Sequence, residues 1–81
     1  MDVIEQFIAD ECVVNEGEQI GAKELFDSYK KWAEDSGEYN MNKNKYGKKM
    51  KEKFESKKSG SIYYLGLNIK ERFPGLANFS N

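Results

Sequence analysis

The apolar residues of the first twelve positions recur at the spacing of one helix face. They fall at i, i+3 or i+4, and i+7 or i+8, which is typical of an amphipathic helix: Val3, Ile4, Phe7, Ile8 and Cys12. Asp2 and Glu5 lie near the expected start of this helix, where the helix dipole favours negative charge. The segment 15–21 (NEGEQIG) then interrupts the pattern with two glycines, and we predict a loop there.

A second helix is predicted over residues 22–36, with charged residues on its outer side. Its apolar stripe consists of Leu25, Phe26, Tyr29, Trp32 and Ala33. Gly37 follows, where a left-handed C-terminal residue is expected. Trp32 has two possible roles, a platform for base stacking or a core side chain. Its spacing from Leu25 and Tyr29 favours the core.

A third helix is predicted from its N-cap at Asn42 to about Phe54, after a short extended stretch. Tyr46, Met50 and Phe54 recur every four residues and are expected to face the core. Gly47 is unusual inside a helix, where glycine costs ~1 kcal/mol relative to alanine. We expect this glycine to allow a close approach to a neighbouring helix.

Residues 54–69 (FESKKSGSIYYLGLNI) show the pattern of a β-hairpin. We expect the turn within residues 57–61, where Gly60 can supply a positive φ. Side chains of the second strand alternate between its two faces. The set expected to face the core is Tyr63, Leu65, Leu67 and Ile69. The set expected on the other face is Ile62, Tyr64 and Gly66.

Three helices followed by a hairpin is the element order of a winged helix. We therefore predict an α+β fold in which the second and third helices form a helix-turn-helix and the hairpin is the wing. The winged-helix domain is expected to span residues 1–70. Residues 71–81 form a C-terminal tail with two open arrangements, a short turn packed against the domain or a loose terminus.

Positive charge is concentrated in residues 43–58, which hold eight lysines against two glutamates, a net charge of +6. The first forty residues carry eleven acids against three lysines, a net charge of −8, and residues 59–81 add +1. The total of −1 therefore hides a strong dipole. A concentration of positive charge indicates a counter-charged partner, most commonly nucleic acid. A solvated lysine-rich helix face is the alternative.

Composition argues against several kinds of site. The chain has no histidine, the commonest general base and metal ligand, and its single cysteine cannot build a structural zinc site. No glycine-rich phosphate loop is present. We therefore expect a non-catalytic protein without a cofactor, a metal or a small-molecule ligand. The lone Cys12 fits a reducing compartment, and no apolar run approaches the ~18–20 residues of a membrane span. A cytoplasmic location away from membranes is expected.

Four stretches of the chain resemble parts of one known family. The runs VIEQFIADEC, LFDSYKKWAEDSG, KYGKKM and YYLGL resemble the C-terminal domain of phage and plasmid primase–helicases, which are related to the poxvirus primase–helicase. The matching positions, within roughly residues 3–69, are Val3 or Ile4, Phe7, Cys12, Leu25, Tyr29, Trp32, Gly37, Tyr46, Gly47, Met50, Tyr64, Gly66 and Leu67. Phe26, Tyr46 and Met50 stand where the family often has Tyr, Phe and Leu, which are similar in volume.

The resemblance implies a role in the DNA replication of a mobile genetic element, in a bacterial or phage-infected cell. Such a domain normally follows a primase region and a superfamily-three helicase motor, and neither fits in 81 residues. The chain is then either an excised domain or a free-standing relative. Its wing carries lysines where the family is rich in arginine, so bidentate reading of bases is not expected.

The outer face of the third helix and the hairpin are the predicted contacts with duplex or forked DNA. Lysine neutralises phosphate, and asparagine and serine add hydrogen bonds. The candidate residues are Asn44, Lys45, Lys48, Lys49, Lys51, Lys57, Lys58, Ser61 and Tyr63. Lys49 lies on the flank of the helix face, and Tyr63 is a candidate for a backbone or stacking contact. Most of these contacts position the protein, so we expect a modest sequence preference.

A protein-interaction role is the alternative function. The acids of the second helix could dock a basic partner, such as the parent helicase motor or another replication protein: Glu24, Asp27, Glu34 and Asp35. This acidic surface is separate from the lysine-rich one, so both roles can hold in one molecule.

Overall fold

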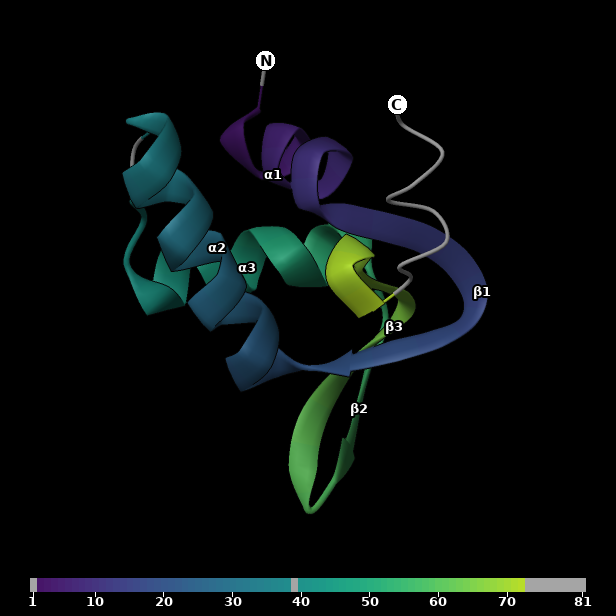
Figure 1. Ribbon diagram of the computed structural model, residues 1–81. Helices are drawn as coiled ribbons and strands as arrows, with labels where there is room; N and C mark the ends of the chain where they lie inside the picture. The colour runs from purple at the N-terminus through teal and green to yellow at the C-terminus, as the bar shows by residue number, and fades with distance from the viewer. Residues whose placement is uncertain (1, 39, 73–81) are drawn as a thin grey trace.

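The computed structural model describes residues 2–38 and 40–72, and it has an α+β architecture (Figure 1). Its elements in chain order are α1 (Val3–Glu11), β1 (Cys12–Gly21), α2 (Ala22–Ser36), α3 (Lys43–Lys53), β2 (Ser56–Ser59), β3 (Ser61–Ile69) and the 3-10 turn η1 (Lys70–Arg72). The strands form an antiparallel sheet in the order β1-β3-β2. Three helices with a three-stranded antiparallel sheet are compatible with the predicted winged helix. The predicted tail lies mostly outside the described residues.

The three predicted helices are confirmed, and their ends are fixed by local capping. The Asp2 Oδ1 atom accepts a hydrogen bond of 2.9 Å from the backbone N–H of Ile4 at the start of α1. Asn42 caps α3 in the same way, accepting from the Lys45 backbone N–H at 2.9 Å. Gly37 ends α2 with φ 71°, the left-handed conformation expected at this position.

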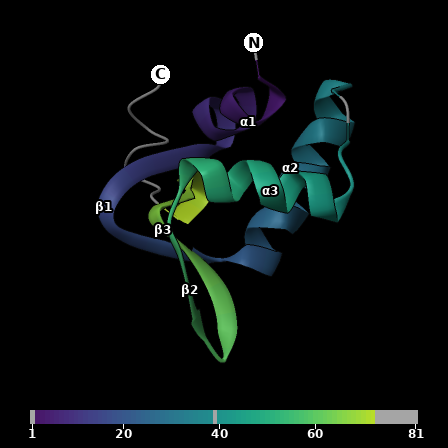
Figure 2. The ribbon, with the colours of Figure 1, turned by 180° about the vertical axis from the view of Figure 1, so that it is seen from behind.

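The predicted loop at residues 15–21 is wrong, because this segment belongs to β1. The strand starts where Cys12 pairs with Ile69 and ends where Gly21 pairs with Tyr63. Partners more than forty residues away supply the backbone hydrogen bonds of this strand. The two glycines indicated a loop because the local sequence carries no information about that distant pairing. The register shifts between Val14 and Gln19. In Figures 1 and 2, β1 is a long curved ribbon that leads from α1 to α2.

The hairpin is confirmed, but the predicted alternation of β3 is only half right. Tyr64 is buried, whereas Tyr63 and Leu65 are partly exposed, contrary to the prediction for all three. Leu67 and Ile69 are buried as predicted. The change of face occurs at Gly66, whose φ of 91° is open to glycine and rarely to other residues. An irregularity of this kind shifts the two-residue alternation by one position.

An aromatic cluster contributed by α1, α2 and α3 forms the centre of the core. The Tyr29 ring lies 4.9 Å from Tyr46 and 5.5 Å from Phe7, measured between centroids. Trp32 is buried beside them, which confirms its core role, and its Nε1–H donates to Asp10 Oδ2 at 3.0 Å. The Tyr29 hydroxyl accepts a 3.1 Å hydrogen bond from the backbone N–H of Met41. This bond attaches the α2–α3 connection to the core.

The face of α3 that was predicted to be buried is confirmed, since Tyr46 and Met50 are buried and Phe54 packs partly buried against the core. The role predicted for Gly47 is wrong. A Cβ atom at this position would meet no atom within 4 Å, so no neighbouring helix approaches it closely. Within the described part of the chain, no helix is both long and apolar enough to cross a membrane.

Candidate nucleic-acid interface

An open groove of about 840 Å³ lies where the start of α2, the outer face of α3 and the start of β3 meet. Its charged lining comprises four lysines and two acids: Lys23, Lys43, Lys48, Lys51, Glu24 and Asp27. The positive end of the α2 dipole adds to the excess of lysine, because Gly21 at the N-cap has no side chain to cap the helix. The groove is therefore suited to an anionic ligand.

The structure brings five of the nine predicted DNA-contacting residues together in this groove. They are Asn44, Lys48 and Lys51 from α3 and Ser61 and Tyr63 from β3. The other four, Lys45, Lys49, Lys57 and Lys58, lie outside its lining. Lys45, Lys57 and Lys58 are exposed, and Lys49 is partly buried. The sequence therefore located the α3 wall of the groove and one end of the β3 wall.

The two hairpin lysines lie on opposite faces of the β2–β3 ribbon. Lys58 pairs with Ile62 and Lys57 with Tyr63, and directly paired residues project from the same face. Ile62 shares its face with the buried Tyr64 two residues later. Lys58 is thus on the side of the helices, and Lys57 is on the far side. The hairpin itself projects away from the helices (Figure 2).

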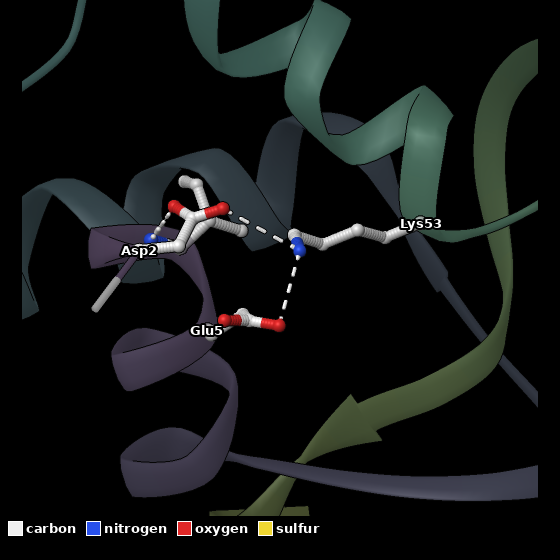
Figure 3. Close-up of polar contacts among 4 residues, drawn as sticks. Asp2, Glu5 and Lys53 are labelled. Carbon is white, nitrogen blue, oxygen red and sulfur yellow. Dashed lines mark hydrogen bonds and ion pairs between the residues drawn. The ribbon is translucent and has the colours of Figure 1, made fainter.

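Another part of the lysine block contacts α1 rather than the groove. The Lys53 Nζ atom lies 3.4 Å from Asp2 Oδ2 and 3.5 Å from Glu5 Oε1 (Figure 3). The hydrogen bond from the Ile4 backbone N–H lowers the pKa of Asp2, and Lys53 and Lys49 lower it further. Lys49 is therefore close enough to α1 for its charge to act on Asp2. The positive charge of α3 is divided between two surfaces.

Several groove residues were not predicted. Lys43, Gly47 and Lys51 follow one another at four-residue intervals and therefore lie on the same side of α3. This spacing could have identified Lys43 from the sequence. Lys23 is far away in the sequence, and only the tertiary fold brings it to the groove. Ile62, with 42% of its surface exposed, adds an apolar contact to the β3 wall. It was predicted on the face away from the core, whereas it shares its face with the buried Tyr64.

A second, smaller hollow of about 350 Å³ has an acidic lining. Its charged residues are Glu11, Glu24, Asp27, Asp35, Glu71 and Lys31. Trp32 and Ile69 also contribute to it. Two of the four acids predicted to dock a basic partner, Glu24 and Asp27, also line the groove, so the two surfaces are adjacent rather than fully separate.

The thiol of Cys12 and the phenol rings of Tyr46 and Tyr64 are buried. Burial raises the pKa of the Cys12 thiol to about 12, and the charge of Glu11 raises it further, so the thiol is protonated at neutral pH. Burial also raises the pKa of Tyr46 and of Tyr64. Within residues 2–38 and 40–72, no three His, Cys, Asp or Glu side chains lie close enough together to hold a metal ion.

Comparison with known protein families gives a match that covers nearly the whole chain. A family model described as poxvirus D5 protein-like matches residues 1–74. This agrees with the resemblance of the four sequence runs to relatives of the poxvirus primase–helicase. No curated protein and no solved structure matches the chain significantly.

Proposed function

The chain belongs to the poxvirus D5 protein-like family, and from this premise we propose that it is a DNA-binding winged-helix module of a phage or plasmid primase–helicase. The proposed role is non-catalytic and cytoplasmic. The order of helices and strands supports the winged-helix assignment, because α2 and α3 are consecutive and the β2–β3 hairpin follows them directly. The pairing of β1 with β3 ends at Tyr63, so the tip of the hairpin extends beyond β1 and is consistent with a wing.

The observation that carries the proposal is the lysine-lined groove. It joins α3 to the hairpin, the two elements with which a winged helix contacts a duplex. Lys43, Lys48 and Lys51 would neutralise phosphates along its α3 wall. The groove also offers Asn44 and Ser61 as hydrogen-bonding groups for phosphate or base edges.

The hairpin contributes through both of its faces. Lys58 lies on the side of the helices and would contact a strand held in the groove, whereas Lys57 lies on the far side of the ribbon. A projecting ribbon with a lysine on each face can therefore reach phosphates of two strands. Because most of these contacts are made to phosphates, the module would bind many sequences with similar affinity.

Fluorescence anisotropy of labelled duplex DNA, measured across a salt series, tests the proposal. If four to six lysines contact phosphates, the slope of log K against log[salt] should be about −4 to −5. Failure of the folded protein to bind DNA at low salt would exclude the proposed function. Forked DNA in a parallel titration shows whether a junction is preferred to a duplex.

The acidic hollow supports a second candidate function, the docking of a basic surface of the parent helicase motor or of another replication protein. Glu11, Asp35 and Glu71 contribute charge there without lining the groove. A pull-down with the motor domain tests this role, using Glu11→Gln/Asp35→Asn as the variant. Capture that is equal for the variant and the wild type would argue against the hollow as the docking site.

A further inference from the structure

Gly47 lies in the interior of α3 although nothing in the fold requires a glycine there. Glycine destabilises a helix interior relative to alanine. A Cβ atom at Gly47 would meet no atom within 4 Å, so packing inside the molecule does not exclude a side chain. Its φ is not in the left-handed region either, unlike that of Gly37, Gly60 or Gly66. The fold therefore tolerates alanine at this position.

The open space beside Gly47 is the groove itself. Gly47 lines the groove between Lys43 and Lys51, which lie one helical turn before and after it, and beside Lys48. The β3 wall contributes the partly exposed side chain of Ile62. The groove thus has an uncovered stretch of α3 backbone, bordered by positive charge and by an apolar contact.

We propose that the sugar–phosphate backbone of DNA packs directly against the α3 backbone at Gly47. A glycine is suited to such a place because it lets a ligand approach the main chain closely. A deoxyribose ring would fill the space that a side chain would otherwise occupy, and its flanking phosphates would contact Lys43, Lys48 and Lys51. This inference rests on the proposed DNA-binding function and identifies the position that limits how closely the DNA approaches.

A size series at one position tests the inference. Gly47→Ala should raise the midpoint of thermal unfolding by about 4–8 °C, because it removes the helix-interior glycine without a clash. The same variant should bind duplex DNA more weakly than the wild type. Gly47→Leu should weaken binding by about five- to a hundredfold, as expected when extra methylenes are forced into a packed contact. Neither variant changes charge, so the salt slope should stay that of the wild type.

The control is Glu52→Leu, which places the same side chain on an exposed position of α3 outside the groove. It should not weaken DNA binding. If Gly47→Leu is folded and binds like the wild type, DNA does not approach the helix there and the inference is wrong. A lower melting temperature for Gly47→Ala would also contradict it, since the glycine would then serve the fold. Absence of DNA binding by the wild type would instead overturn the proposed function on which the inference rests.

Discussion

Two tyrosines in the aromatic cluster should respond in opposite ways to the same substitution. The Tyr46 hydroxyl is buried and has no hydrogen-bond partner among the described residues. The Tyr29 hydroxyl, in contrast, accepts the buried backbone N–H of Met41 at 3.1 Å. The two rings lie 4.9 Å apart, so they share one environment. Replacing each tyrosine by phenylalanine therefore isolates the contribution of the hydroxyl hydrogen bond.

The expected magnitudes follow from the cost of burying an unpaired polar group. That cost is about 1–3 kcal/mol, so Tyr46→Phe should raise the free energy of unfolding by about 1 kcal/mol after the small void left by the hydroxyl is allowed for. Tyr29→Phe should lower it by about 1–3 kcal/mol, because the Met41 N–H loses its acceptor inside the core. In a domain of this size, 1 kcal/mol corresponds to about 4–8 °C in melting temperature.

Urea denaturation followed by the fluorescence of the buried Trp32 measures both effects. The denaturant midpoint should rise for Tyr46→Phe and fall for Tyr29→Phe, with unchanged slopes of the transition. If Tyr46→Phe destabilises the protein as much as Tyr29→Phe does, the Tyr46 hydroxyl has a partner in solution and the reasoning is refuted.

Two further predictions concern the N-terminal part of the chain. Asp2→Ala should destabilise the protein by about 0.5–2 kcal/mol through loss of the α1 cap, whereas Asp2→Asn keeps an acceptor and loses only the partly exposed ion pair with Lys53, at about 0–1 kcal/mol. Because the pKa of Asp2 is lowered from 3.8, its charge stabilises the fold above that pH, and this contribution is lost as the pH falls through the lowered pKa. In urea denaturation at several acidic pH values, the free energy of unfolding should therefore fall less steeply with decreasing pH for Asp2→Asn than for the wild type. Equal pH dependence of the two proteins would contradict a stabilising role of the Asp2 charge. Cys12, with a pKa raised to about 12, should react with a disulfide reagent at pH 8 only when urea unfolds the chain, and rapid labelling of the native protein would show that it is not buried.

Local sequence patterns predicted the helices well because their signals lie within a few residues. The apolar stripes, the Asn42 cap and the left-handed Gly37 are all short-range features, and each is found where expected. β1 was missed because its stability comes from pairing with β3, far along the chain. The alternation predicted for β3 failed for the residues before Gly66 for a related reason, since an irregular pairing between two distant strands sets the face.

The candidate site was predicted in part for the same physical reason. The α3 residues of the groove could be placed from helical spacing, and the hairpin from its turn signals. Lys23 could not be assigned, because only tertiary folding brings the start of α2 to α3. Lys49 was predicted to belong to the basic surface, but it lies outside the groove, and its charge lowers the pKa of Asp2 at the start of α1. The absence of a side chain at Gly47 becomes informative only when its surroundings are known.

The central claim, that the groove and the adjoining hairpin face bind DNA, is tested most directly by two charge-matched double variants. Lys48→Glu/Lys58→Glu reverses charge in the groove and on the hairpin face beside it, whereas Lys30→Glu/Lys31→Glu reverses the same charge on exposed positions of α2 outside the groove. In fluorescence anisotropy across a salt series, the first variant should bind duplex DNA more weakly, with a salt slope shallower by about 2. The second should keep the slope of the wild type. Equal losses for the two variants, or unchanged binding by a folded Lys48→Glu/Lys58→Glu protein, would contradict the account.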